Sequence, residues 1–147
     1  MKIVVASDCH GDLYTLRKIA SSEYDADYYL LLGDSCLDEE SIRPFISVKG
    51  NNDYFSSFPL ERIIHTPYGN IYMEHGHLRN IVDVEFVKKK DCFIYLFGHS
   101  HAHFLKEIEG VYFANPGSTS RPRDNTNGTY LLISLDEKDV KFDFVYL

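Results

Sequence analysis

The sequence predicts an α/β protein built from two β-sheets that pack face to face, with helices on the outside. In the first half, short apolar runs rich in β-branched residues alternate with helical spacing, which is typical of βαβ units and a largely parallel sheet. In the second half, strand patterns joined by tight turns indicate hairpins. A length of 147 residues is enough to bury the core of one domain, so we expect a single domain over residues 1–147.

Apolar runs and one amphipathic pattern define the elements of the first half. Buried strands are expected over residues 3–6, 28–32 and 45–48. Between the first two strands, apolar residues recur at helical spacing over residues 13–22, and Asp12 can cap that helix. A short helix is expected over residues 38–43, and it would have to end before Pro44.

Turn residues divide the second half into hairpins. Hairpin strands are expected over residues 62–66, 70–74, 103–107 and 111–114. Pro67-Tyr68-Gly69 and Glu109-Gly110 supply the two turns. A helix is expected over residues 81–90, because three lysines at its end suit the helix macrodipole. Further strands are expected over residues 92–97, 130–134 and 140–146.

Composition narrows the class of protein. The net charge of −7 argues against non-specific binding to nucleic acid or to anionic membranes, and it fits carboxylates whose charge a cation offsets. The three cysteines are widely spaced and form no C-x-x-C pair, which favours a reducing compartment over a disulfide framework. No apolar run reaches transmembrane length. We therefore expect a cytoplasmic protein.

Polar side chains follow one predicted strand after another. These side chains are Asp8, His10, Asp34, Asn51, His75, His77, His99 and His101. On an extended backbone Asp8 and His10 point to one side, and Cys9 between them points into the core. The carboxyl ends of parallel strands meet at one edge of a sheet, where α/β proteins bind ligands. We therefore expect these side chains to gather there.

The donor types point to a metal site. Oxygen and imidazole ligands without a thiolate suit Mn²⁺, Fe or Zn²⁺. There are too many candidates for one tetrahedral ion, and they suit two ions about 3.5–4 Å apart that share a bridging carboxylate. Such a pair can clamp phosphoryl oxygens and generate a nucleophile at neutral pH.

The order of the motifs resembles the calcineurin-like metallophosphoesterases. D-x-H, G-D, G-N-x-D, H-G-H and G-H-x-H follow one another along the chain. Asn115-Pro116-Gly117-Ser118, followed by Arg121-Pro122-Arg123, is similar to the small single-domain YfcE-type phosphodiesterase family. The resemblance extends over residues 1–123 and implies a four-layer αββα sandwich of two mixed sheets flanked by helices.

The resemblance also implies roles for individual residues. Asp8, His10 and His101 would hold a first metal ion. Asn51, His75 and His99 would hold a second, and Asp34 would bridge both, so Asn51 and Asp34 count as catalytic as well as ligating residues. The implied metal is Mn²⁺, with Fe, Zn²⁺ and Ni²⁺ as alternatives. The implied reaction is attack by a metal-bridging hydroxide on the phosphorus of a small or nucleotide-derived phosphodiester.

One position departs from the family pattern. Many relatives read G-N-H-[DE], where the histidine is a candidate to protonate the leaving group, whereas this chain has Asn52 there. An amide cannot act as a general acid at neutral pH. His77 is a candidate substitute donor, and its alternative role is to support a ligating imidazole. Arg121 and Arg123 are candidates to orient the substrate phosphate, with solvated surface as the equal alternative.

Three functions remain open at this stage. The favoured one is a metal-dependent phosphodiesterase with a small-molecule phosphodiester as its substrate. The alternatives are a phosphomonoesterase or nucleotidase on the same metal centre, and a protein-binding scaffold like a eukaryotic retromer subunit with a degraded metal site. Every ligand position is filled here, which favours an enzyme over the scaffold. Two alternatives are open for three aromatic residues, Tyr54, Phe55 and Phe58. They form a contact in a homo-oligomer, or they fold back on the core.

Overall fold

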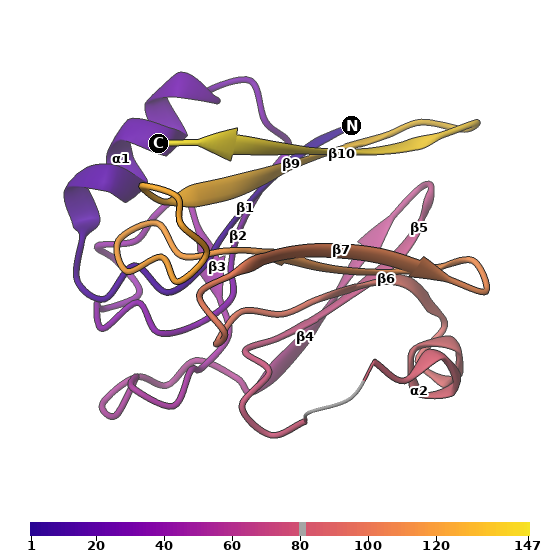
Figure 1. The fold of residues 1–147 in the computed structure, drawn as a ribbon, viewed down its shortest axis with the longest axis horizontal. Helices are drawn as coiled ribbons and strands as arrows, with labels where there is room; N and C mark the ends of the chain where they lie inside the picture. Colours follow the sequence, from indigo (N-terminus) through magenta and orange to yellow (C-terminus); the bar gives the residue numbers. More distant parts are fainter. Residues whose placement is uncertain (80–81) are drawn as a thin grey trace.

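The computed structural model describes residues 1–79 and 82–147, which form two five-stranded sheets and two helices (Figure 1). The first sheet has the order β10-β9-β1-β2-β3 and consists of β1 (Lys2–Ala6), β2 (Tyr28–Leu31), β3 (Ile46–Ser47), β9 (Thr129–Leu135) and β10 (Val140–Tyr146). The second has the order β4-β5-β6-β8-β7 and consists of β4 (Glu61–Thr66), β5 (Gly69–Glu74), β6 (Cys92–Leu96), β7 (His103–Ile108) and β8 (Val111–Pro116). The helices are α1 (Leu13–Ser22) and α2 (Val84–Lys89).

Both sheets are mixed. In the first, β1, β2 and β3 are parallel, whereas β9 runs antiparallel to β1. In the second, β5, β6 and β8 are parallel, and the outer strands β4 and β7 are antiparallel to their neighbours. The parallel arrangement expected for the first-half strands is thus found in β1, β2 and β3, to which the C-terminal hairpin adds β9 and β10. In the second sheet the three central strands are parallel, and hairpins place antiparallel strands at both edges.

Side chains of β1 alternate between two apolar clusters. Ile3 and Val5 belong to the cluster between the two sheets, where they are fully buried. Val4 lies on the other face and packs with Leu16 and Ile19 of α1. This alternation follows from the period of two along a strand, which sends successive side chains to opposite faces.

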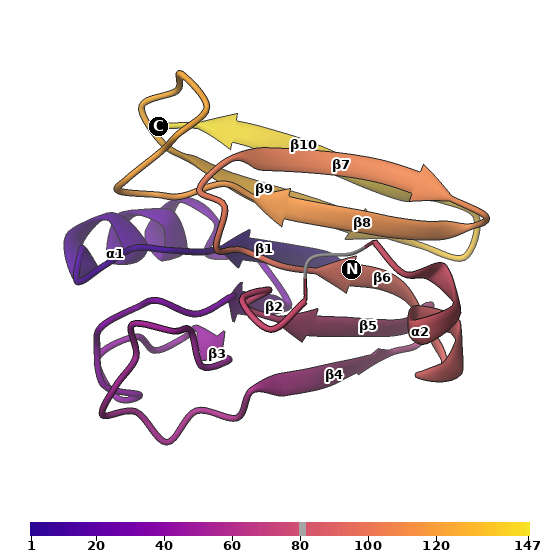
Figure 2. The same cartoon turned by 60° about the horizontal axis from the view of Figure 1, so that its bottom comes forward.

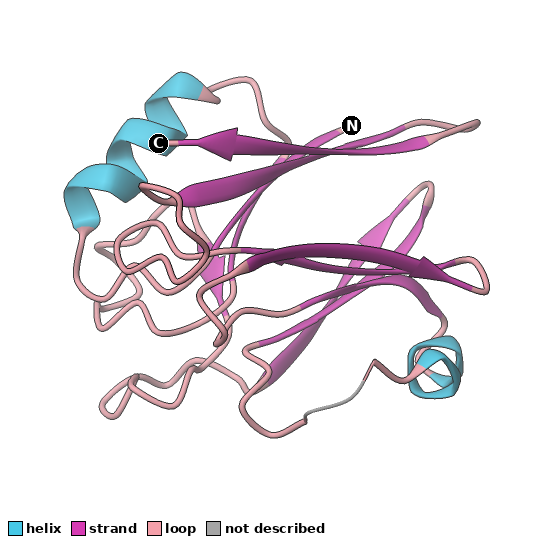
Figure 3. Cartoon of the chain, in the orientation of Figure 1, coloured by secondary structure: helices cyan, strands magenta, loops and turns pink. Residues whose placement is uncertain are grey.

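The side chains of the second sheet also alternate between two apolar clusters. Ile71 and Met73 of β5 join the cluster between the sheets, and Tyr72 between them packs with Val87 of α2. Each sheet is therefore covered by the other sheet on one face and by a helix on the other. Figure 3 shows α1 and α2 at opposite corners of the molecule, as an αββα sandwich requires. The predicted four-layer fold is confirmed.

Two predicted elements differ from the structure. Residues 38–43 form a series of turns, in which the Asp38 carboxylate accepts hydrogen bonds from Ser41. Six residues before a proline are too few to repay the cost of helix nucleation. The helix expected over residues 81–90 begins at Val84 after the N-cap Asp83, and position 81 lies outside the described residues.

The loops that leave the parallel strands share one end of the molecule. In Figure 2 the arrows of β1, β2, β5, β6 and β8 point to the same end, and Figure 3 shows long loops gathered there. This end carries the polar residues singled out in the sequence. The described residues include no helix with the length and apolar character needed to cross a membrane.

Candidate metal centre

Asp8 and His10 leave β1 in an unusual backbone conformation. Their φ angles are +52° and +43°, in the left-handed region that non-glycine residues rarely adopt. The expectation that they lie on an extended backbone is therefore wrong, since β1 ends at Ala6. The tight turns nevertheless bring Asp8 and His10 to the same site, and Cys9 is fully buried in the cluster under α1 as expected.

The same backbone conformation recurs at the other strand ends. Asp34, His99 and His101 have φ angles of +52°, +67° and +59°. Left-handed residues cost free energy and are retained where the surrounding structure enforces them, which is common at functional sites. In this chain they mark the positions where the candidate ligands leave the sheets.

Four side chains form a compact first group. Asp8, His10, Asp34 and His101 each offer one ligand atom, and these atoms all lie within 4.8 Å of one another. The Nε2 atoms of His10 and His101 are 3.3 Å apart, and His101 Nε2 lies 3.2 Å from Asp8 Oδ1. Two imidazoles and two carboxylates that converge on one point match the donors preferred by Mn²⁺, Fe and Zn²⁺.

The two oxygens of the Asp8 carboxylate differ in their hydrogen bonding. Oδ2 accepts hydrogen bonds from Ser7 Oγ at 2.6 Å and from the backbone N of His99 at 3.0 Å. Oδ1 is buried and accepts no hydrogen bond among the described residues, and the polar atoms near it are His101 Nε2 at 3.2 Å and His75 Nε2 at 3.8 Å. An unpaired buried carboxylate oxygen costs free energy. The residues present therefore fit a bound cation, which would provide the missing partner for Oδ1.

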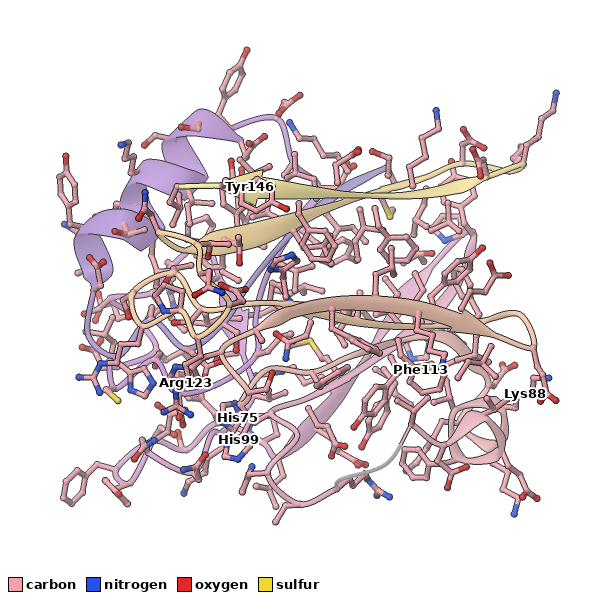
Figure 4. All side chains as sticks on the ribbon, in the orientation of Figure 1. His75, Lys88, His99, Phe113, Arg123 and Tyr146 are labelled. Carbon is pink, nitrogen blue, oxygen red and sulfur yellow. The ribbon has the colours of Figure 1, made fainter. Side chains whose placement is uncertain are left out.

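Asn51, His75 and His99 form a second group. Asn51 Oδ1 lies 3.0 Å from His75 Nε2 and 3.1 Å from His99 Nδ1. The two imidazole rings have their centroids 5.2 Å apart and are nearly perpendicular, and Figure 4 shows them next to each other. The structure thus brings together the residues that the sequence assigns to a second ion.

Asp34 lies between the two groups. Its Oδ2 atom is 3.8 Å from His10 Nε2 in the first group and 3.4 Å from His75 Nε2 in the second. Asn52 secures this carboxylate by donating from its backbone N to Oδ1 at 2.8 Å and from Nδ2 to Oδ2 at 2.7 Å. A single carboxylate shared by two groups of ligands is the arrangement that a bridging ligand requires.

The charge state of Asp34 suits cation binding. Burial by itself would raise the pKa of this carboxyl, but hydrogen bonds from His75 and Asn52 outweigh it and hold the pKa well below its usual range. Asp34 is therefore ionised at neutral pH. For His75, burial lowers the pKa, but the Asp34 and Asp8 carboxylates outweigh burial and raise it. The second group thus lies in a negative field that a cation could offset.

The remaining imidazoles divide into two cases. Burial lowers the pKa of His10 and of His99, which favours the neutral, metal-binding form at neutral pH. The contact with Asp8 raises the pKa of His101. The two directions differ because burial dominates at His10 and His99, whereas the hydrogen bond with Asp8 dominates at His101.

Backbone carbonyls and a distant serine orient the ligands. His75 Nδ1 lies 2.6 Å from Leu32 O, and His101 Nδ1 lies 2.7 Å from Arg121 O, which leaves each Nε2 free to face the site. Ser118 Oγ donates to Asp8 O at 2.8 Å. Sequence reasoning placed Ser118 in a motif but missed its contact with Asp8, and it assigned no role to Ser7, because a serine in a loop carries no sign of its partner.

His77 is brought next to the site without joining either group. Its ring centroid lies 5.4 Å from that of His75 and 6.3 Å from that of His99. Its Nδ1 atom is buried without a hydrogen-bond partner among the described residues. Burial, followed by the neighbouring imidazoles, lowers its pKa. This position is compatible with both roles considered for His77.

The two candidate phosphate-binding arginines are placed differently. Arg121 lines a cavity that it shares with His10. Arg123 does not belong to the described lining of that cavity, although its backbone N donates to His101 O at 2.8 Å. Figure 4 shows Arg123 at the same end of the molecule as His75 and His99. Of the two arginines, Arg121 thus belongs to the described lining of the cavity, and a contact of either one with substrate stays a prediction.

Comparison with known proteins identifies the family. The protein-family model described as the calcineurin-like phosphoesterase superfamily domain matches residues 1–138 of this chain. The chain belongs to the calcineurin-like phosphoesterase superfamily. It is therefore a metal-dependent phosphoesterase, a hydrolase. The family resemblance seen in the sequence is confirmed.

Individual relatives agree with this assignment. The probable metallophosphoesterase YsnB of Bacillus subtilis is 30% identical over 144 residues, covering 92% of this chain and 85% of YsnB. Phosphodiesterase YfcE of Escherichia coli K12 is 25% identical over 165 residues, covering 92% of this chain and 89% of YfcE. A crystal structure of a predicted phosphoesterase from Streptococcus pneumoniae is 28% identical, with a TM-score of 0.86 over 99% of this chain and 88% of that one.

The fold also occurs in Vps29. The zinc complex of Vps29 from Entamoeba histolytica is 21% identical and has a TM-score of 0.74, covering 99% of each chain. At this identity the likeness concerns the fold alone. Because one fold can carry several functions, the function must be argued from the site.

Proposed function

We propose that this superfamily member is a phosphodiesterase that holds two divalent metal ions and hydrolyses a small or nucleotide-derived phosphodiester. The observation that carries the proposal is the position of Asp34 Oδ2, which lies 3.8 Å from His10 Nε2 and 3.4 Å from His75 Nε2. A carboxylate oxygen between two groups of ligands supports a pair of ions rather than a single one. The name of YfcE, a phosphodiesterase, adds support for a diester substrate.

The proposed ligands divide between the two ions. Asp8, His10 and His101 would hold the first ion, Asn51, His75 and His99 would hold the second, and Asp34 would bridge them. When bound, such a pair supplies Lewis acidity at the phosphoryl oxygens and a nucleophile at neutral pH. We propose Mn²⁺ as the native metal, with Fe, Zn²⁺ and Ni²⁺ as alternatives, because the donors are oxygen and imidazole nitrogen without a thiolate.

Asn52 favours diesters with good leaving groups. Its side chain donates to Asp34 Oδ2, and an amide has no proton to give to a leaving group at neutral pH. His77 is the remaining candidate donor near the site, at 5.4 Å between ring centroids from His75. Arg121 lines the adjacent cavity, where its charge would orient the phosphate.

Two further properties belong to the proposal. We propose that residues 1–147 act as one domain, since the αββα layers extend from β1 to β10. We also propose a cytoplasmic location, because the chain carries three free cysteines, of which Cys36 is exposed. A free exposed thiol persists best in a reducing compartment.

The proposal is tested by hydrolysis of a chromogenic phosphodiester with protein stripped by a chelator, with Mn²⁺ titrated back. A phosphomonoester with the same leaving group is assayed in parallel. Activity restored by metal, with diester cleavage well above monoester cleavage, would support the proposal. Preferred monoester cleavage would replace it with a phosphatase or nucleotidase.

The same titration separates the scaffold alternative from an enzyme. Calorimetry is run on the same samples to count the metal ions bound per chain. Tight binding of Mn²⁺ without cleavage of either ester would overturn the phosphodiesterase and favour a protein-binding role. A stoichiometry of one ion with full activity would overturn the two-metal part of the proposal.

A further inference from the structure

A cavity of about 700 Å³ opens beside the candidate metal centre. His10 and Arg121 line its polar side, and Tyr54, Phe55 and Leu37 supply an apolar side. The cavity therefore places a candidate metal ligand, a cation and two aromatic rings around one space. This size is typical of a site for a small molecule.

The two aromatic side chains are exposed. Tyr54 is 73% exposed and Phe55 is fully exposed, whereas the nearby Phe58 is only 6% exposed and packs in the cluster under α1. Of the two alternatives left open by the sequence, Phe58 thus folds back on the core, whereas Tyr54 and Phe55 remain exposed. A single exposed aromatic residue needs no explanation, but two neighbours that line one cavity next to a reaction site do.

The segment that presents these rings is fixed at both ends. At one end the Asp53 carboxylate accepts hydrogen bonds from the backbone N of Gly50 and of Asp34, both at 2.8 Å. At the other end Phe58 is buried, and Pro59 O accepts a hydrogen bond from Lys49 N at 2.8 Å. The anchors hold the backbone of the short segment between them next to the cavity, so that this backbone needs little ordering on binding.

Tyr54 is linked to the metal centre. Its hydroxyl donates to Asn52 Oδ1 at 3.3 Å, and Asn52 Nδ2 donates to Asp34 Oδ2 at 2.7 Å. The chain of contacts runs from the aromatic side of the cavity to the candidate bridging carboxylate. A group stacked on these rings would therefore be held at a defined position relative to the metal centre.

Arg121 provides the complementary charge. Within the described part of the chain it forms no ion pair, and its backbone O accepts from His101 Nδ1 at 2.7 Å. Its position is thus tied to a candidate ligand while its guanidinium is available to an anion. A phosphate near Arg121 and a flat ring near Phe55 would fill the two sides of the cavity.

We propose that this cavity binds a planar aromatic group on one ester of the phosphodiester substrate, stacked against Phe55 and Tyr54 with Arg121 beside the phosphate. The inference rests on the proposed phosphodiesterase function and specifies its substrate. Aromatic rings stack in preferred geometries and give more affinity than an aliphatic group of similar area. The ring can be a nucleobase or a simple aryl group, because every base has a π-face.

Pairs of phosphate ligands that differ only by the ring test the inference. Adenosine 5′-monophosphate is compared with ribose 5-phosphate, and phenyl phosphate with methyl phosphate. Dissociation constants are measured by NMR titration with chelator present, so that no hydrolysis occurs, and inhibition constants are measured with Mn²⁺-loaded protein. We expect the ligands with a ring to bind about tenfold more tightly, as one stacking contact predicts.

Variants identify the stacking residue. Phe55→Ala should bring the two dissociation constants within each ligand pair close to each other. The affinity for ribose 5-phosphate should not change. Phe55→Leu should do the same, because it keeps an apolar side chain but removes the ring. Tyr54→Phe should retain the preference. The matched control is Tyr24→Ala, which removes an aromatic side chain that is 83% exposed elsewhere on the surface.

The outcomes separate this inference from the proposed function. Equal affinity within both pairs in the wild-type protein would overturn the inference, as would a preference that survives Phe55→Leu. Hydrolysis of a chromogenic diester in that same case would leave the phosphodiesterase intact. A preference for the ring that depends on Phe55, in a protein that cleaves no ester, would support the binding site and overturn the enzymatic proposal.

Discussion

The Asp53 carboxylate fixes the backbone of Asp34. Its Oδ2 atom accepts a hydrogen bond from Asp34 N at 2.8 Å, and its Oδ1 atom accepts one from Cys36 N at 2.9 Å. The same Oδ2 also accepts from Gly50 N. One buried carboxylate thus ties the loop after β2 to the loop after β3, and these loops carry Asp34 and Asn51.

Replacing this carboxylate should weaken the site without removing a ligand. In Asp53→Asn one oxygen becomes an amide that faces a backbone N–H donor, so at least one hydrogen bond is lost. We expect the affinity for Mn²⁺ to fall about 10–100-fold, as for other residues that support ligands. The free energy of unfolding should fall by about 1–3 kcal/mol. Calorimetric titration and urea unfolding measure the two effects, and unchanged Mn²⁺ affinity would argue against this positioning role.

Asp34→Asn tests the bridging role directly. The substitution removes the negative charge between the two groups of ligands while preserving the size of the side chain. We expect fewer than two bound Mn²⁺ ions per chain. The loss of diesterase activity should exceed the roughly 10–100-fold loss that follows replacement of a residue that only supports a ligand. The fold should remain near intact by circular dichroism. The matched control is Asp38→Asn, which removes a carboxylate from the lining of the adjacent cavity. Near-wild-type turnover of Asp34→Asn would contradict the bridging role.

Gly98→Ala should damage the site by steric contact alone. A Cβ atom there would lie 2.0 Å from Ser7 Oγ and 2.8 Å from Asp8 Oδ2, so Ser7 would have to move away from Asp8. We expect weaker Mn²⁺ binding by calorimetry, along with a lower melting temperature. Gly110→Ala is the control, because its added Cβ meets open space although its φ is +81°. That control should lose about 1–2 kcal/mol of stability to backbone strain and keep its Mn²⁺ affinity. Equal Mn²⁺ affinities in the two variants would refute the steric argument.

His77→Ala separates a proton donor from a ligand. We expect the variant to keep both metal ions, because His77 joins neither group of ligands. For a diester with a poor leaving group, turnover should fall by about 10²–10⁴-fold if His77 is the general acid. A diester that releases p-nitrophenolate needs no proton and should be much less affected. Loss of metal would instead make His77 a ligand or its direct support, and His65→Ala, on the exposed hairpin, is the control.

Much of the site could be predicted because residue type and strand position were both visible in the sequence. Asp8, Asp34 and His99 each follow an apolar run, and the ends of parallel strands meet by topology. The structure brings these side chains together, while metal ligation itself stays a prediction. The left-handed backbone at Asp8 and Asp34 could not be predicted, because local propensity disfavours it and only tertiary contacts enforce it.

Contacts between distant segments were also beyond sequence reasoning. Ser118 donates to the backbone of Asp8 across 110 positions, and neither residue type indicates that partner. Phe55 and Phe58 have the same side chain and lie three positions apart, but one is exposed and the other is buried. Which ring enters the core depends on the path of a loop, and no periodic pattern encodes that path. The short turns at residues 38–43 were missed for a similar reason, since the Asp38 side chain takes part in their hydrogen bonding and no periodic pattern indicates that.

The contact between Asp124 and His103 predicts how stability depends on pH. Asp124 Oδ2 accepts from His103 N at 2.8 Å and lies 2.6 Å from His103 Nδ1, and Oδ1 accepts from Thr126 Oγ1. Burial would raise the pKa of this carboxyl, but these bonds from Thr126 and His103 outweigh it and hold the pKa well below its usual range. The ionised form therefore adds stability above the unfolded value of about 3.9, and that stability is lost as the pH falls through the folded value.

Asp124→Asn should accordingly be less stable than the wild type at pH 7 by about 1–3 kcal/mol. The difference should shrink steadily as the pH is lowered below about 4, because the carboxyl of the unfolded wild-type chain then takes up a proton, whereas the folded protein binds one only at lower pH. Urea unfolding of chelator-treated protein at several pH values measures this, with Asp143→Asn on the exposed side of β10 as the control. A difference that stays constant with pH would show that shape rather than charge matters. Since Asp124 anchors the loop that carries Arg121, the variant should also bind phosphate ligands less tightly at pH 7.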